Sequence, residues 1–180
     1  MIAAMRRVWL LVLLLALVPR PAAARTFEIA AGYALARDSR DAVTLPAGWI
    51  AAAAIDLTPT FAIVADLSAQ SKTMTLFDAD ARLRVHTAMG GLRASGRLGA
   101  LTAFGQLLAG IVQASGSAFG ATSTSRLPGV QPGVGIDCRL TRAWAARGAL
   151  DIRLTAAQPD GQNASTQYRF VAGVVYRHRR

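Results

Sequence analysis

The sequence predicts an all-β protein: an eight-stranded antiparallel up-and-down transmembrane β-barrel, preceded by a cleavable signal peptide. Three observations lead to this prediction. The N-terminus has the pattern of an export signal. The rest of the chain repeats segments of about ten residues in which apolar and polar residues alternate. The connections between these segments are alternately short and long, as expected for strands that run up and down around one barrel.

The first 24 residues have the three parts of a secretory signal peptide. Arg6 and Arg7 are followed by the apolar run Val8 to Val18 and by the small residues Ala22 to Ala24. The run is too short for a membrane-spanning helix, which needs about 20 residues. We therefore expect residues 1–24 to be a signal peptide cleaved after Ala24, and residues 25–180 to be the barrel domain.

Charge and cysteine content exclude two other classes of exported protein. Loss of residues 1–24 removes Arg6, Arg7 and Arg20 and no acid, so the formal net charge falls from +10 to +7. The remaining basic residues are arginines except Lys72, and they are scattered, so we expect no nucleic-acid binding. Cys138 is the only cysteine, and the chain therefore cannot be a small domain held by internal disulfides.

Period-2 alternation defines the expected strands. The fifth is apolar on both faces, but Gly105 and Gly110 weaken a helix there, and Gln106 is in register with Phe104 and Leu108. We expect the last strand to pair with the first and close the barrel. The eight segments are Phe27 to Ala36, Ala47 to Leu57, Phe61 to Ser68, Arg82 to Arg93, Ala100 to Val112, Val130 to Leu140, Trp144 to Thr155 and Tyr168 to Arg180.

The connections predict an orientation. Short turns are expected at 58–60, 94–99 and 141–143, and longer loops rich in Gly, Ser, Thr, Asp and Pro at 37–46, 69–81, 113–129 and 156–167. In outer-membrane barrels the short turns face the periplasm and the long loops face outward. Both termini of the domain are then expected on the periplasmic side.

Which face of the strands points into the barrel distinguishes a membrane barrel from a soluble one. A soluble lipocalin-like carrier buries its apolar face, whereas an outer-membrane barrel exposes it to lipid. Ten residues at about 3.3 Å each, tilted by about 40°, cover about 25 Å, which is the height of an outer-membrane apolar band. Aromatic residues also cluster at strand ends on the apolar face, as interfacial girdles require. They are Phe27, Trp49, Phe61, Trp144, Tyr168 and Tyr176.

The other face mixes charges of both signs, and we expect it to fill the lumen with ion pairs. An eight-stranded barrel is only wide enough inside for side chains. Small residues on this face would leave room for the arginines. The expected lumen set is Glu28, Asp56, Asp66, Asp137 and Asp151 with Arg82, Arg84, Arg139, Arg147, Arg153, Arg169 and Arg177, and its glycines are Gly32, Gly48, Gly90, Gly105 or Gly110, Gly133, Gly135 and Gly173.

The whole mature chain resembles the small eight-stranded bacterial outer-membrane β-barrels of the opacity, OmpA-like and OmpX-like kind. The resemblance is carried by the pattern of "FEIAAGYALARD", "MGGLRAS", "FGQLLAGI", "QPGVGIDCRL" and "YRFVAGVVYR". It implies the bacterial outer membrane, contact with membrane lipid and lipopolysaccharide, and biogenesis through the barrel-assembly machinery and periplasmic chaperones. Members usually end on an aromatic residue, but this chain continues past Tyr176 to Arg177, His178, Arg179 and Arg180.

No residue pattern predicts catalysis. His86 is the only histidine within an expected strand apart from the basic tail, and the alternation places it in the lumen without a nucleophile and an orienting acid. Two histidines and one cysteine make no zinc site, so no metal, cofactor or catalytic residue is expected. We expect a monomeric, non-enzymatic barrel with a structural or surface-interaction role. The alternatives are a lipocalin-like carrier, a lipid A-modifying barrel enzyme centred on His86, and a small pore.

Overall fold

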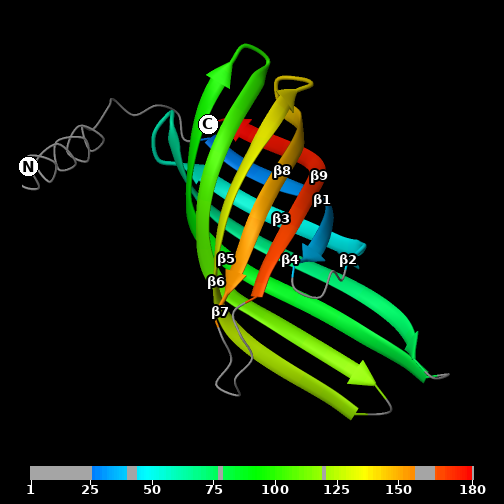
Figure 1. The fold of residues 1–180 in the computed structure, drawn as a ribbon. Coiled ribbons are helices and arrows are strands. Elements are labelled where there is room, and N and C mark those ends of the chain that lie inside the picture. The colour runs from blue at the N-terminus through cyan, green and yellow to red at the C-terminus, as the bar shows by residue number, and fades with distance from the viewer. Residues whose placement is uncertain (1–25, 40–43, 77–78, 119–120, 157–164, 180) are drawn as a thin grey trace, which may run out of the picture.

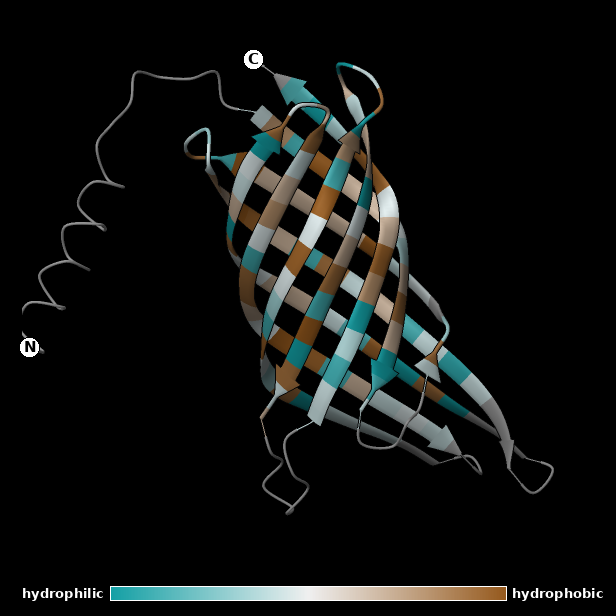
Figure 2. Cartoon of the chain, turned by 45° about the horizontal axis from the view of Figure 1, so that its top comes forward, coloured by the Kyte–Doolittle hydropathy of each residue, from teal (hydrophilic) through white to brown (hydrophobic). Residues whose placement is uncertain are grey.

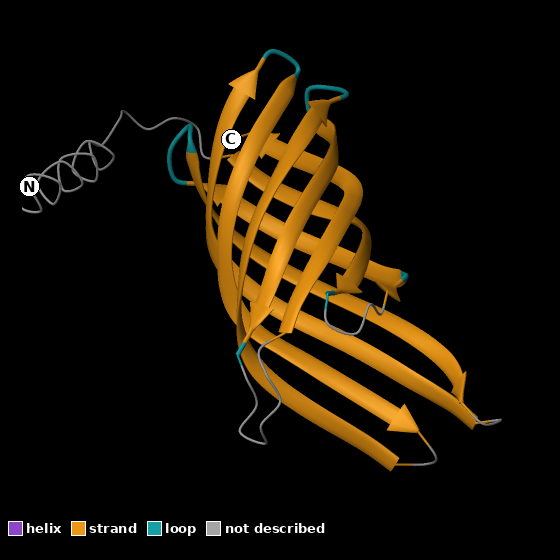
Figure 3. Ribbon diagram, in the orientation of Figure 1, coloured by secondary structure: helices purple, strands orange, loops and turns teal. Residues whose placement is uncertain are grey.

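The computed structural model describes residues 26–39, 44–76, 79–118, 121–156 and 165–179. The predicted signal peptide and its cleavage site lie outside the described residues. The described part consists of strands joined by turns (Figure 3). The strands are β1 (Thr26–Asp38), β2 (Thr44–Leu45), β3 (Ala47–Asp56), β4 (Phe61–Leu76), β5 (Ala79–Leu98), β6 (Leu101–Ala118), β7 (Ala121–Arg139), β8 (Trp144–Thr155) and β9 (Ser165–Arg179). Within these ranges no helix is long and apolar enough to cross a membrane.

Eight of these strands form a closed antiparallel barrel, which confirms the predicted fold class. Strands β1 and β3 to β9 each pair with the next one along the chain. The ends meet because β9 pairs with β1 from Thr26 opposite Arg179 to Asp38 opposite Gln167. The predicted closure of the last strand onto the first is therefore confirmed (Figure 1). The two-residue strand β2 adds to the edge of β1 near Ala36.

The outer surface is largely apolar, whereas the lumen holds charged and polar side chains together with buried apolar ones. Hydrophobic and hydrophilic residues alternate along the strands (Figure 2). Ile29, Val134 and Phe170 are among the large apolar side chains exposed on the outside, while Glu28, Asp151 and Arg169 are buried inside. The predicted facing of the first, second, third, seventh and eighth segments is confirmed. Strand β6 confirms that the fifth segment is a strand, with Phe104 and Leu108 buried.

Two of the predicted long loops are wrong, because most of their residues are strand. Strands β4 and β5 pair up to Leu76 opposite Ala79, and β6 and β7 pair up to Ala118 opposite Ala121. Strand β4 continues at 72–76 beyond its pairing with β3, and β7 continues at 121–128 beyond its pairing with β8. Together with 79–86 of β5 and 113–118 of β6, which lie between them, these segments form what we call the extension (Figure 1). Their Ser, Thr and Gly content is typical of loops, but ladder pairing satisfies the backbone there.

The connections at the opposite end are short. The turns at 58–60 and 141–143 are confirmed. The expected turn at 94–99 is shorter than predicted, because β5 continues to Leu98 and turns at Gly99, which has φ +65°. The short turns lie at the end of the barrel that holds the C-terminus and the start of β1 (Figure 1).

The predicted facing of the fourth segment is wrong. Val85, Thr87 and Met89 are buried inside the barrel, while Arg82 and Arg84 are exposed outside. The reason is a change of polarity along β5. The exposed apolar side chains around the outside of the barrel, such as Ile29, Val134 and Phe170, form what we call the apolar belt. Towards the extension β5 leaves this belt, so its apolar side chains turn inward as in a soluble sheet. Its inward apolar side chains join a cluster of Ala36, Leu45, Ala54, Ala62, Val64, Val85, Met89, Leu108 and Val112.

Candidate functional site

A first group of ion pairs fills the lumen near the short turns. Glu28 accepts from Arg93 Nη1 at 2.7 Å, from Arg147 Nη2 at 2.6 Å and from Arg177 Nε at 3.0 Å. Asp137 is bound by Arg147 Nε at 2.7 Å and also by Arg177. We call these five residues the turn-side network. Each of its carboxylates meets at least two guanidinium groups, so the charges compensate one another locally.

An aromatic ring supports this network from one side. The guanidinium carbons of Arg93 and Arg147 lie 4.6 and 4.8 Å from the centre of the Phe104 ring. The ring occupies the space that a side chain at residue 135 would need, because a Cβ on Gly135 would overlap the ring. The glycine therefore makes room for an aromatic platform under two arginines, which adds cation–π attraction to the ion pairs.

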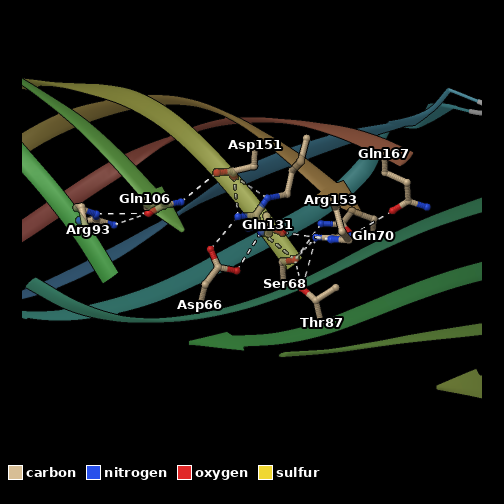
Figure 4. A network of polar contacts seen from close by, with 11 residues as sticks. Asp66, Ser68, Gln70, Thr87, Arg93, Gln106, Gln131, Asp151, Arg153 and Gln167 are labelled. Carbon is tan, nitrogen blue, oxygen red and sulfur yellow. Dashed lines mark hydrogen bonds and ion pairs between the residues drawn. The ribbon is translucent and has the colours of Figure 1, made fainter. Parts of the chain in front are cut away.

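A second group lies further toward the extension. Arg169 is fully buried and binds Asp66 and Asp151, each at 2.8 Å. Gln106 links the two groups, because it accepts from Arg93 at 3.2 Å and donates to Asp151 at 3.0 Å. Figure 4 shows this chain of contacts across the lumen. We call Asp66, Asp151, Arg169 and Arg153 the loop-side network.

Arg153 differs from the other lumen arginines. It is fully buried, and within the described part of the chain it contacts neutral acceptors only. It donates to Gln131 Oε1 at 3.2 Å and to Gln167 Oε1 at 3.3 Å, with longer contacts to Ser68 and Thr87 (Figure 4). Its charge is therefore balanced through space by the nearby carboxylates rather than by a direct ion pair.

The outer face of the extension is basic. Arg84 on β5 lies in register with Ser115 on β6, and Ser115 lies in register with Thr124 on β7. One step closer to the belt, His86 is followed across the sheet by Gln113 and Arg126. Arg82, Arg84, His86 and Arg126 are all exposed. We call these four the basic face.

Comparison with solved structures identifies the fold. The chain matches the Yersinia pestis attachment invasion locus protein Ail, in a complex with the heparin analogue sucrose octasulfate, at 15% identity and TM-score 0.65, covering 87% of this chain and 100% of Ail. It matches neisserial surface protein A at 12% identity and TM-score 0.66, covering 87% and 99%. It matches OprG of Pseudomonas aeruginosa at 13% identity and TM-score 0.57, covering 86% and 96%. No protein-family profile and no curated protein sequence matches the chain.

The chain has the fold of the small eight-stranded outer-membrane β-barrels. The predicted resemblance to this group is therefore confirmed at the level of fold. In an outer-membrane barrel the exposed apolar belt faces lipid and the charged face lies inside. The lipocalin-like alternative requires the opposite arrangement, with a cavity lined by apolar residues.

Eight of the predicted lumen charges have the predicted position: Glu28, Asp66, Asp137, Asp151, Arg147, Arg153, Arg169 and Arg177. Asp56 is half-buried at the end of β3. Arg82, Arg84 and Arg139 were predicted wrongly, because the first two lie on the basic face and Arg139 is exposed where β7 ends. Arg93 was missed, because the inverted facing of the fourth segment placed it outside.

The predicted glycines are mostly on the lumen side, with one correction. Gly90 faces outward, and its neighbour Gly91 faces inward in its place. A Cβ on Gly133 would overlap the carboxylate of Asp151, while Gly32 and Gly173 allow two backbones to approach closely. The small residues therefore make room for a carboxylate, a ring and the backbone, and not for arginines directly.

The prediction that His86 lies in the lumen is wrong. It is exposed on the outer face of β5, in register with Ala69 and Gln113. Within the described residues it makes no hydrogen bond or ion pair, and so it lacks there both the nucleophile and the orienting acid that a catalytic histidine needs. The described residues also contain no group of three His, Cys, Asp or Glu that could hold a metal ion.

Proposed function

We propose that the protein is a non-enzymatic, monomeric barrel of the bacterial outer membrane that acts through the surface it presents beyond the bilayer. One observation carries this proposal: an apolar outer belt surrounds an ion-paired interior, and four strands project past the belt at the end opposite the C-terminus. Such an arrangement is stable only when lipid covers the belt.

Aromatic side chains support the position of the belt in a bilayer. Trp144 packs on Tyr176 with ring centres 5.1 Å apart beside a short turn, and Phe27 and Phe61 lie at the same end. Trp49, Tyr33 and Tyr168 lie toward the extension. Two such girdles mark two membrane–water interfaces. We infer that the short turns face the periplasm after cleavage behind Ala24 and insertion with the help of periplasmic chaperones and the barrel-assembly machinery.

The compartment and the barrel can be tested together. The mature protein should be recovered in outer-membrane fractions, and its migration on a gel should change on heating, as it does for closed membrane barrels. A mature protein that is folded and monodisperse without detergent would contradict the proposal and favour the lipocalin-like carrier.

We propose that the lumen is plugged. Arg153 and Arg169 are both fully buried across its middle, and ion pairs tie opposite walls together. Planar bilayers that contain the protein at high load should show no conductance steps. Regular steps that scale with protein amount would favour the small-pore alternative.

We propose that the basic face binds the phosphate groups of lipopolysaccharide in the outer leaflet. Arg82, Arg84 and Arg126 point outward directly beyond the apolar belt, where these phosphates lie, and arginine suits phosphate geometry. The variant Arg82→Gln, Arg84→Gln, Arg126→Gln should bind lipopolysaccharide more weakly in a detergent-based binding assay. Dephosphorylated lipopolysaccharide should bind wild type and variant alike, and a phosphate-independent loss would contradict this site.

The enzymatic alternative is tested at His86. If the protein modified lipid A, His86→Ala would change the lipid A mass profile of cells that express it. We expect an unchanged profile, because His86 has no catalytic partner within the described residues.

A further inference from the structure

The short-turn end of the barrel carries a second exposed basic surface that the function proposed above does not use. The β5–β6 turn presents Arg97 and Leu98, and the β7–β8 turn presents Arg139, Leu140 and Arg142. The two turns are joined, because Arg139 N donates to Ala100 O at 2.9 Å. They lie close together at the end of the barrel where the chain terminates (Figure 1). We call these five residues the turn rim.

The charge of the turn rim is uncompensated. All three arginines are exposed, and within the described residues none of them makes a hydrogen bond or an ion pair through its side chain. The stretches 95–101 and 138–144 contain no Asp or Glu. Of the nearby acids, Asp137 is already bound by Arg147 and Arg177 inside the lumen, and Asp56 is half-buried. The rim therefore presents net positive charge to its surroundings.

The leucines of the turn rim are unusually exposed. Leu98 is 70% and Leu140 is 63% exposed, the highest values among the large apolar side chains of the described residues. Both continue the outward-facing side of their strands, below Leu92 on β5 and Ile136 on β7. Such side chains are stabilised where lipid covers them, next to the paired aromatic rings of Trp144 and Tyr176.

We propose that the turn rim binds the anionic headgroups of phospholipids in the adjacent, periplasm-facing leaflet, with phosphatidylglycerol as the simplest example. This rests on the membrane location proposed above. The leucines hold the two turns at the interface. Arg142 lies in the turn itself, and Arg97 and Arg139, which end the lumen-facing sides of their strands, are exposed at the rim, so that their long side chains reach the phosphate layer. A guanidinium group binds phosphate through two parallel hydrogen bonds, and the leaflet's anionic lipids supply the missing countercharge.

A tryptophan beside the rim can report on the lipid. After residue 24 the chain contains two tryptophans, Trp49 and Trp144, and Trp144 follows Arg142 by two residues. The Trp49→Phe protein would be folded into phosphatidylcholine vesicles that contain a small fraction of either brominated phosphatidylglycerol or brominated phosphatidylcholine. Relative quenching gives the preference of lipids near Trp144. We expect phosphatidylglycerol to be preferred about fivefold, the effect of one arginine near an anionic surface.

The variant Arg97→Gln, Arg139→Gln, Arg142→Gln in the same background should lower this preference to about one, since the exposed arginines that create it are gone. Arg82→Gln, Arg84→Gln, Arg126→Gln removes the same charge at the other end and should leave the preference unchanged. Because screening weakens exposed charges, raising the salt concentration should also lower the preference in the protein with its arginines intact. That measurement does not depend on the folding of any arginine variant.

Three outcomes would overturn the proposal. Equal quenching by both lipids overturns the turn rim as an anionic site while leaving the membrane barrel intact. If the preference for phosphatidylglycerol falls equally in both triple variants, it arises from the net charge of the whole protein and not from the turn rim. Absence of quenching by either lipid, with no change of migration on heating, overturns the membrane barrel and the site with it.

Discussion

Arg169 holds two carboxylates inside the barrel, and its removal should be costly. Asp66 and Asp151 are both buried and both bound by Arg169 at 2.8 Å. In Arg169→Ala they face each other without this cation, which costs about 3–5 kcal/mol for a broken buried pair. Denaturant unfolding of the lipid-embedded protein, followed by Trp fluorescence, measures this loss.

Arg177→Gln is the matched control for this experiment. Arg177 is partly exposed, and its partners keep other cations, because Glu28 still has Arg93 and Arg147, and Asp137 still has Arg147. We expect a smaller loss of about 1.5–3 kcal/mol, the effect of hydrogen bonds to a charged group. An equal loss in both variants would show that the burial of an ion pair does not determine how much it contributes to the free energy of unfolding.

Gly133 and Gly148 provide a second comparison between neighbouring strands. A Cβ on Gly133 would overlap the Asp151 carboxylate, whereas a Cβ on Gly148 would have no heavy atom within 4 Å. Gly133→Ala should therefore lower the free energy of unfolding by about 1–3 kcal/mol, the range for overpacking. Gly148→Ala should leave it unchanged or raise it by about 0.5 kcal/mol, because alanine restricts the unfolded chain. Equal effects in the same unfolding assay would argue against a lumen built around Asp151.

At the scale of elements, strand existence was easier to predict than strand length and facing. The alternation identifies β1, β8 and β9 with their correct faces because one polarity rule holds along their predicted segments. In β5 the rule reverses between Arg84 and Leu92, so one pattern spans two environments. No single alternation describes such a strand, and this is why Arg93 was missed and His86 misplaced.

Strand β6 can test where the belt ends. Leu107 and Ser115 both lie on its outward face, Leu107 within the belt and Ser115 on the extension beside Arg84. Leu107→Asp should cost about 2 kcal/mol, near the lower end of the range for a charge at the middle of a bilayer. Ser115→Asp should cost about 0 kcal/mol, because its carboxylate stays in water and faces an arginine. Unfolding from vesicles measures both, and a similar loss for Ser115→Asp would place the extension inside the membrane.

For the molecule as a whole, the sequence predicts closure, the polarity of the lumen and most of its acids and arginines. It does not predict the partners within the lumen, because which carboxylate meets which guanidinium depends on the stagger of eight strands. The basic end of the chain illustrates this. The alternation of the last segment places Arg177 in the lumen, but only the structure shows that β9 brings it to Glu28 and Asp137.

The orientation of the whole barrel yields the last prediction. With Cys138 replaced by serine, a single cysteine can be placed at Ser123 on the extension or at Thr60 in the β3–β4 turn, both of which are exposed. If the extension faces outward, a membrane-impermeant maleimide added to intact cells should label Ser123→Cys and not Thr60→Cys. Thr60→Cys should be labelled once the outer membrane is permeabilised. The reverse pattern would invert the orientation, and would place the turn rim, with Arg97 and Arg142, in the outer leaflet. Labelling of both sites in intact cells would mean that the barrel does not separate two compartments.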